Sequence, residues 1–203
     1  MKLEKFEVPG LAHYSYIISS QGAAAVVDPQ RDVAPYMHYA RRHGLTLRYV
    51  LETHIHADYA SGALELARLS GAELWLSGHD EGEDYAYQFP HHEFRDGETL
   101  EFGEVSLRAL HTPGHTPEHL SFLVYDRTRS QEQAVAILSG DFVLVGSLGR
   151  PDLLGEAAKR RLAGALYASV HEGLAGLQDG VEVHPAHGAG TPVSYTHLRA
   201  HET

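Results

Sequence analysis

Residues 53–62 read Thr-His-Ile-His-Ala-Asp-Tyr-Ala-Ser-Gly. The preceding residues, 45–52, carry apolar side chains at alternate positions, which predicts a strand that delivers this segment into a loop. His54 and His56 lie two positions apart, so in extended chain their imidazoles leave on the same side. Asp58 adds a carboxylate. Imidazole and carboxylate groups at this spacing favour a site for a divalent metal ion.

Tyr59 is the position that separates a site for one metal ion from a site for two. A second divalent ion needs a nitrogen donor here, and a phenol is a much poorer ligand. The sequence therefore favours a single metal. Two roles for Tyr59 stay open: a packed aromatic residue whose hydroxyl finds a backbone partner, or a residue that faces the substrate.

The composition narrows the class of protein. The 203 residues fit one domain, and 16 Lys and Arg against 27 Asp and Glu give a net charge of −11. That balance argues against nucleic acid or an anionic membrane surface as a partner. Neither a transmembrane run nor a signal peptide is apparent, so we expect a cytoplasmic protein. Cysteine is absent, whereas histidine occurs 16 times. Any metal is therefore held by imidazole and carboxylate.

The last eleven residues, 193–203, read VSYTHLRAHET. They resemble the translation of an adapter used in sequencing-library preparation. We hypothesise that the natural chain continues past Pro192 and that residues 1–192 form the domain. Such a segment is left out of reasoning about the fold. His197 and His201 are then not candidate ligands.

Sequence periodicity indicates strands and helices in mixed order. Helical spacing predicts helices over 31–43, 60–69 and 155–173. Alternation and short apolar runs predict strands over 2–8, 14–20, 23–28, 45–52, 73–77, 99–102, 105–110, 120–125, 134–139 and 181–184. Antiparallel runs of strands with helices between groups predict an α/β layered sandwich.

Three further residues extend the candidate metal site. His115 stands in Thr-Pro-Gly-His-Thr-Pro, where Pro113 and Gly114 force a tight turn that presents its side chain. Asp141 follows an apolar strand, and His187 follows a short one. Each residue alone is weak evidence, but the three in this order after a His-x-His-x-Asp cluster favour metal chemistry.

The order and spacing of these residues resemble the metallo-β-lactamase superfamily, whose fold is a four-layer αβ/βα sandwich with metals between two sheets. The resemblance covers about residues 2–192. Within the superfamily, the sequence is most similar to persulfide dioxygenases, especially the bacterial kind fused to a rhodanese domain. The segments that carry this similarity are 53–62, 111–118, 139–142, 149–155 and 185–190.

The resemblance implies that His54, His115 and Asp141 hold one Fe(II) ion per chain. Two histidines and one carboxylate on one face of an octahedral ion leave three positions open. Zinc can replace iron in a mis-metallated preparation, since it outcompetes Fe(II) at most such sites. The residues expected to orient the ligands or hold water are His56, Asp58 and His187.

The implied reaction is the oxidation of a low-molecular-weight persulfide, such as glutathione persulfide, by O₂ to sulfite and the free thiol. Tyr59 and Arg150 are the candidate catalytic residues. Arg150 either fixes its loop by an ion pair with Asp152 or meets a carboxylate of the thiol substrate. The expected partners are the persulfide and O₂. A rhodanese domain or protein and a homodimer stay open.

Two other functions compete with the dioxygenase. A glyoxalase II-like thioester hydrolase would use metal-activated water, ideally between two ions, and Tyr59 argues against it. A non-catalytic metal-binding or sulfur-relay module would need a partner domain. Metal content separates the first two functions, and oxygen uptake with a persulfide separates the dioxygenase from the third.

Overall fold

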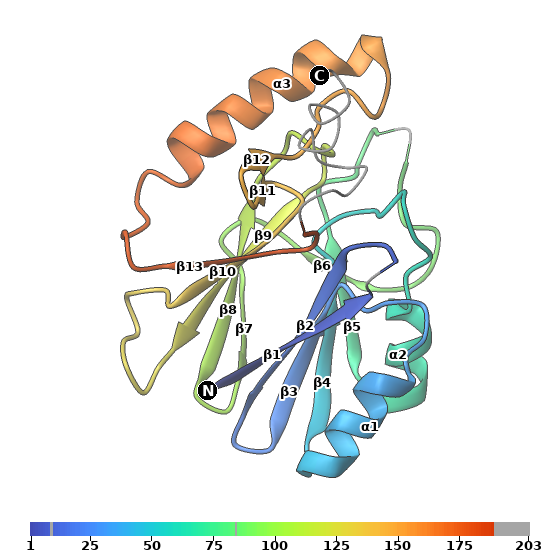
Figure 1. Cartoon of the computed structure of the whole chain (residues 1–203), viewed down its shortest axis with the longest axis vertical. Coiled ribbons are helices and arrows are strands. Elements are labelled where there is room, and N and C mark those ends of the chain that lie inside the picture. The colour runs from blue at the N-terminus through green and yellow to red at the C-terminus, as the bar shows by residue number, and fades with distance from the viewer. Residues whose placement is uncertain (9, 84, 189–203) are drawn as a thin grey trace.

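The computed structural model describes residues 1–8, 10–83 and 85–188 and builds them around two mixed sheets (Figure 1). The expected tail, residues 193–203, and the expected domain end at Pro192 lie outside the described residues, so both stay predictions. Among the helices that the structure describes, none has the length and apolar character needed to cross a membrane.

The first sheet has six strands in the order β1-β2-β3-β4-β5-β6. Strands β1 to β3 pair antiparallel through short turns, whereas β3 to β6 pair parallel. Parallel neighbours need a crossover, and helices supply it between β3 and β5. The six strands are β1 (Lys2–Val8), β2 (His13–Ser20), β3 (Ala23–Val27), β4 (Thr46–Leu51), β5 (Glu73–Ser77) and β6 (His92–Phe94).

The second sheet has five strands in the order β13-β10-β9-β8-β7. All its pairs are antiparallel except β10 with β13, which returns to the sheet after a helix. Its strands are β7 (Thr99–Phe102), β8 (Val105–His111), β9 (Leu120–Asp126), β10 (Ala136–Gly140) and β13 (Glu182–Pro185). A small hairpin of β11 (Val143–Leu144) and β12 (Ser147–Leu148) follows β10.

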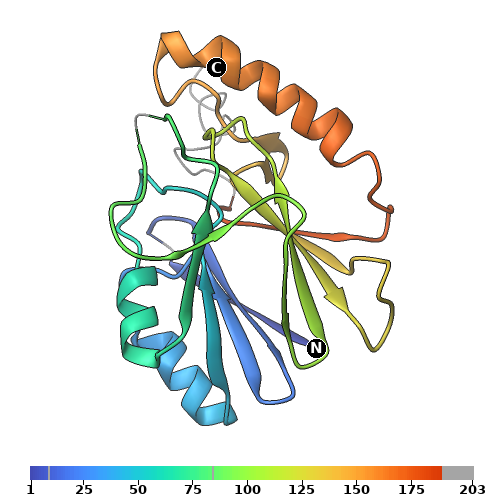
Figure 2. The same cartoon turned by 180° about the vertical axis from the view of Figure 1, so that it is seen from behind.

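Three helices in the described part of the chain complete the layers. Helices α1 (Ala34–His43) and α2 (Ala63–Ser70) cover the outer face of the first sheet. Helix α3 (Glu156–Ala168) ends in a π-helical turn, Ser169–Gly173, and lies on the opposite side of the molecule, as Figures 1 and 2 show. The predicted four-layer α/β sandwich is therefore confirmed.

The main core fills the space between the two sheets. Residues of β2, β3 and β4 from the first sheet contact residues of β7 to β10 from the second. Phe94 and Phe122 stack across this interface with ring centroids 5.8 Å apart. Both side chains are fully buried. Burial of aromatic rings on both sheets therefore fixes the distance between the layers.

The predicted elements differ from the structure mainly at their starts. The first helix begins at Ala34 rather than residue 31, because Asp32 Oδ1 accepts a hydrogen bond from the Ala34 amide and Pro35 occupies the first turn. The second begins at Ala63 rather than residue 60. Strands β6, β11 and β12 were not predicted because each has only two or three residues.

The fold brings the carboxyl ends of several strands to one edge of the molecule. Strand β4 leads into His54, β10 leads into Asp141, and β13 leads into His187. The loop between β8 and β9 carries His115. Segments more than one hundred residues apart in sequence therefore meet at this edge.

Removal of the Phe122 ring should destabilise the protein more than removal of an exposed ring. Phe122→Ala is expected to lower the free energy of unfolding by about 3–5 kcal/mol, because it leaves a cavity between the sheets. Tyr167 on α3 is 67% exposed and serves as the control. Urea denaturation of both variants checks this, and equal losses would contradict the assigned core.

Candidate metal centre

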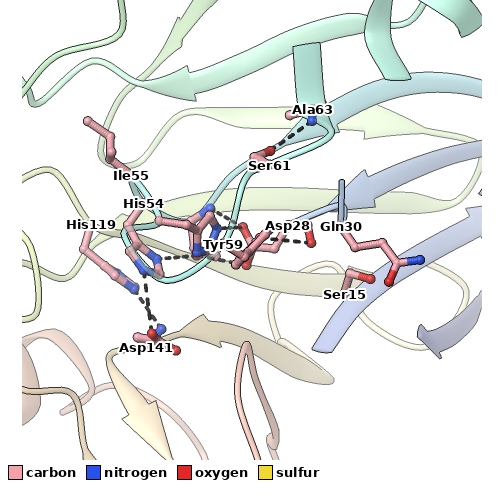
Figure 3. A network of polar contacts seen from close by, with 12 residues as sticks. Ser15, Asp28, Gln30, His54, Ile55, Tyr59, Ser61, Ala63, His119 and Asp141 are labelled. Atoms are coloured by element: carbon pink, nitrogen blue, oxygen red, sulfur yellow. Dashed lines mark hydrogen bonds and ion pairs between the residues drawn. The ribbon is translucent and has the colours of Figure 1, made fainter. Parts of the chain in front are cut away.

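His54, His115 and Asp141 form a buried triad at the edge where the strands meet. One ligand atom from each lies within 4.8 Å of the other two. The Nε2 atoms of His54 and His115 lie 3.7 and 3.6 Å from Asp141 Oδ2. None of the three residues is more than 3% exposed. Figure 3 shows His54 directed toward Asp141.

Hydrogen bonds fix the proton position on both imidazoles. His115 Nδ1 lies 3.2 Å from the carbonyl oxygen of Arg150, which can only accept, so Nδ1 carries the proton. The Thr53 hydroxyl donates to Asp28 Oδ2 at 2.9 Å, so it accepts from His54 Nδ1, also at 2.9 Å. Both Nε2 atoms therefore present lone pairs to the centre of the triad.

The charge state of the triad suits a cation. Burial lowers the pKa of His54 well below its ordinary value, and burial also lowers the pKa of His115. Both rings are therefore neutral near pH 7. Asp141 Oδ2 is buried and has no hydrogen-bond partner among the residues that the structure describes. Two neutral nitrogen donors and one unpartnered buried carboxylate oxygen fit a divalent metal ion.

Asp28 organises the segment that carries the first histidines. It follows β3 with a φ of 52°, and its Oδ1 accepts from the Thr53 amide at 2.7 Å. The same oxygen lies 3.2 Å from His56 Nε2. Sequence reasoning missed Asp28 because it read as the last residue of a strand. The signal available was a polar residue before Pro29 at a strand exit.

His56 faces Asp28 through Nε2 rather than the triad. Burial lowers the pKa of His56, but the Asp28 carboxylate outweighs burial and raises the pKa to about 9. Its Nδ1 is buried and finds no hydrogen-bond partner within the described residues. His56 packs on His54 with ring centroids 4.1 Å apart, so it supports that ring through contact.

His187 joins two carboxylates. Its Nδ1 lies 2.7 Å from Asp141 Oδ1, and its Nε2 lies 2.8 Å from Asp58 Oδ2, although the latter atoms are not aligned for a hydrogen bond. Burial lowers the pKa of His187, but these carboxylates raise it to about 10. Asp58 and His187 therefore form an ion pair, and Asp141 keeps Oδ2 for the triad.

Tyr59 lies between two rings beside the triad. Its ring centroid is 4.0 Å from that of His13 and 4.5 Å from that of His56. The hydroxyl lies 3.4 Å from the Asp28 carbonyl oxygen. Burial raises the pKa of Tyr59 well above its ordinary value, so the phenol stays protonated. The aromatic packing and the backbone partner that we considered for Tyr59 from the sequence are therefore both present.

Arg150 contacts the site through its backbone. Its carbonyl oxygen orients His115, while its Nε and Nη2 pair with Asp152 Oδ1 and Oδ2 at 3.1 and 3.0 Å. The ion pair considered for this loop therefore exists. Gly149 lies so close to the site that a Cβ there would meet the Asp141 carbonyl oxygen at 1.9 Å.

Two further histidines were missed by sequence reasoning. His119 is fully buried, and its Nε2 accepts a hydrogen bond from the Asp141 amide at 3.1 Å. His13 begins β2 and is also fully buried, and neither of its ring nitrogens has a hydrogen-bond partner in residues 1–8, 10–83 and 85–188. Burial lowers the pKa of His13 to about 4. Neither residue stands in a local pattern that indicates its contacts.

The chain belongs to the Metallo-beta-lactamase superfamily, because the model of that family matches residues 8–187. Members of this superfamily are enzymes. The family resemblance drawn from the motifs is thereby confirmed, whereas the fusion to a rhodanese domain stays a prediction.

The relatives of this chain include both hydrolases and persulfide dioxygenases. The hydroxyacylglutathione hydrolase of Anaeromyxobacter dehalogenans (strain 2CP-C) is 32% identical over 183 residues, covering 90% of this chain and 64% of the relative. The mitochondrial persulfide dioxygenase ETHE1 of Homo sapiens is 28% identical over 188 residues, covering 86% and 63%. The chain therefore spans less than two thirds of the length of either relative.

A solved structure supports the same fold. The crystal structure of a metallo-beta-lactamase from Staphylococcus aureus subsp. aureus COL has a TM-score of 0.88 and 35% identity to this chain. The likeness covers 96% of this chain and 58% of that chain. The choice between hydrolase and dioxygenase therefore depends on the chemistry of the site.

Burial of His13 should make the metal-free protein sensitive to acid. The unfolded chain binds the proton of this histidine near pH 6.5, whereas the folded protein binds it only near pH 4. Stability from neutral His13 is therefore complete above pH 6.5 and is lost as the pH falls toward 4. Relative to His13→Phe, the wild type should lose roughly 1–2 kcal/mol between pH 7 and 5. Urea denaturation of both proteins measures this, and a difference independent of pH would contradict it.

Proposed function

We propose that the protein is a mononuclear non-haem Fe(II) dioxygenase that oxidises a low-molecular-weight persulfide to sulfite and the free thiol. The observation that carries this proposal is the triad of two neutral imidazole Nε2 atoms and one carboxylate oxygen that is unpartnered among the described residues. Two histidines and one carboxylate with open positions are typical of non-haem Fe(II) oxygenases. The similarity to persulfide dioxygenase ETHE1 supports the choice of substrate.

The arrangement around the triad favours one metal ion. A second ion beside Asp141 would need Asp58 and His187 as ligands, but these two residues face each other at 2.8 Å. Tyr59, which follows Asp58, offers a protonated phenol instead of an imidazole. Among the described residues, His54, His115 and Asp141 form the one cluster that could hold a metal.

Ferrous iron bound by His54, His115 and Asp141 would supply the redox chemistry that allows dioxygen to react with a persulfide. For glutathione persulfide the balanced reaction is GSSH + O₂ + H₂O → GSH + SO₃²⁻ + 2H⁺, so water provides the third oxygen of sulfite. The terminal sulfur is oxidised and the S–S bond breaks. These 203 residues contribute orientation of the reactants, and none of them is a cysteine that could act as a thiol nucleophile.

The residues of the chain have separate tasks in this proposal. Thr53 and the Arg150 carbonyl hold the histidine tautomers whose Nε2 lone pairs bind the metal. His187 holds the far oxygen of Asp141. The partly exposed Arg150 guanidinium, kept in orientation by Asp152, would meet a carboxylate of the thiol. Tyr59 would form part of the wall beside the metal. A rhodanese domain or protein, which handles persulfides, is the proposed partner.

A thioester hydrolase is the second candidate. The 32% identity to a hydroxyacylglutathione hydrolase over 90% of the chain favours it. That reaction would use metal-activated water, ideally between two ions. The contact between Asp58 and His187 and the phenol of Tyr59 disfavour the second ion.

Iron-loaded protein prepared without oxygen provides the test of function. We expect one iron per chain, oxygen uptake with glutathione persulfide, and sulfite in equal amount to the oxygen consumed. Hydroxyacyl thioesters of glutathione should be hydrolysed slowly or not at all. Thioester hydrolysis without oxygen uptake would reject the dioxygenase and support the second candidate.

Variants of the triad identify the ligands. His54→Ala, His115→Ala and Asp141→Ala should each lose iron and turnover, because one of three protein ligands is removed. His38→Ala on the exposed face of α1 is the control and should keep both. Full iron content and turnover in any triad variant would remove that residue from the ligand set. Metal analysis and oxygen uptake are the measurements.

Tyr59→His tests why the protein would hold a single ion. An imidazole at this position adds a nitrogen donor beside Asp58 and His187, so the variant should bind a second divalent ion. Tyr59→Phe lacks a donor and should still bind one. Titration with zinc followed by metal analysis gives the count. A Tyr59→His variant that binds one ion would show that Tyr59 does not set the metal number.

A further inference from the structure

His119 is a fully buried histidine outside the triad that contacts two of the segments carrying it. Its ring stacks on the His54 ring, with centroids 5.0 Å apart and planes at 23°. Its Nε2 accepts a hydrogen bond from the Asp141 amide at 3.1 Å. Figure 3 shows His119 beside His54, with both rings directed toward Asp141.

The hydrogen bonds of His119 define a single neutral form of its ring. A backbone amide can only donate, so Nε2 carries no proton and Nδ1 must carry one. Nδ1 lies 2.9 Å from Thr112 Oγ1, which lies 2.9 Å from Ser121 Oγ. His119 Nδ1–H therefore donates to the Thr112 hydroxyl, which donates to the Ser121 hydroxyl. These two hydrogen bonds hold the His119 ring in one orientation.

Both ring nitrogens are thus occupied by protein groups. Nε2 accepts from Asp141, and Nδ1 donates to Thr112. A metal ligand needs a free lone pair, and His119 has none left. His119 therefore acts on its neighbours rather than on a metal.

Gly140 brings the main chain against this imidazole. It has a φ of 53°, and a Cβ there would lie 2.5 Å from His119 Nε2 and 2.6 Å from Thr53 Oγ1. Only glycine adopts this turn and this approach readily. The turn directs the next amide, that of Asp141, at the ring. The direction of Asp141 is therefore set jointly by Gly140 and His119.

The same region also holds the first histidine segment. The Leu120 amide donates to the Thr53 carbonyl oxygen at 2.7 Å, and the Thr112 amide donates to the His119 carbonyl oxygen at 2.9 Å. The start of β9 consequently connects the segment of His54, the loop of His115 and the turn before Asp141. A substitution at His119 would therefore affect all three of these segments.

We propose that His119 is a positioning residue, which fixes the main chain of Asp141 through its Nε2 and so aims Asp141 Oδ2 at the metal. This inference rests on the proposed metal triad. Loss of the acceptor leaves the buried Asp141 amide without a partner and releases the turn after β10. Groups that orient metal ligands typically change metal affinity by about 10–100-fold when they are removed.

Two substitutions of similar size separate the acceptor from the bulk of the side chain. His119→Leu fills the space but accepts no hydrogen bond. His119→Gln can place its Oε1 near the position of Nε2 and accept from the Asp141 amide. Val124→Ala, a buried change on β9 without polar contacts, controls for a general loss of stability. Co(II) affinity of the metal-free proteins is measured by titration, together with thermal unfolding.

His119→Leu should bind Co(II) at least about ten-fold more weakly than the wild type. His119→Gln should recover most of that loss, and Val124→Ala should unfold at lower temperature with unchanged affinity. Wild-type affinity in His119→Leu would overturn the inference, as would equal losses in the Leu and Gln variants. A wild type that binds no Co(II) would reject the triad and with it the proposed function.

Nitrogen NMR of the metal-free wild type tests the geometry without any metal. The His119 ring should show a protonated Nδ1 and an unprotonated Nε2, and His119→Leu should shift the Asp141 amide signal. A proton on Nε2 of His119 would overturn the inference whatever reaction the enzyme performs.

Discussion

The Asp141 carboxylate is the constraint around which this site is arranged. It is completely buried, with one oxygen 2.7 Å from His187 Nδ1. Within the described part of the chain, its other oxygen has no hydrogen-bond partner. A buried anion is costly unless it is paired or coordinates a metal. The unpartnered oxygen faces two imidazoles whose lone pairs are turned toward it. A cation at that point satisfies all three groups at once.

The fold provides this arrangement from distant parts of the chain. Strands of both sheets end at the same edge. The carboxylate that follows β10 therefore meets one histidine that follows β4 and another that lies in the loop after β8. Around the triad lie groups that orient the ligand residues rather than bind the metal. Asp28 holds the Thr53 segment, and His119 holds the Asp141 amide. Rigid strands and these contacts together keep the donors in place before any metal binds.

Hydrophobic periodicity predicted most of the strands and helices, because it is a local property. The four layers and the choice of His54, His115 and Asp141 as the triad came from the resemblance to the superfamily. Asp28 and His119 could not be found in this way. Asp28 contacts Thr53 across 25 positions and His119 contacts Asp141 across 22, so only the folded chain reveals them. Strand β6 was not predicted because three residues carry no periodicity. Helix α1 begins at Ala34 because Asp32 Oδ1 accepts a hydrogen bond from the Ala34 amide in the preceding turn and Pro35 occupies the first helical turn. His13 gave no signal, since its neighbours Tyr59 and His187 come from other segments.

The most direct measurement of the central claim is anomalous X-ray diffraction at the iron edge from crystals of protein loaded with iron under anaerobic conditions. One anomalous peak per chain, within coordination distance of His54 Nε2, His115 Nε2 and Asp141 Oδ2, is the predicted result. Two peaks flanking Asp141, with Asp58 and His187 as ligands of the second, would contradict it.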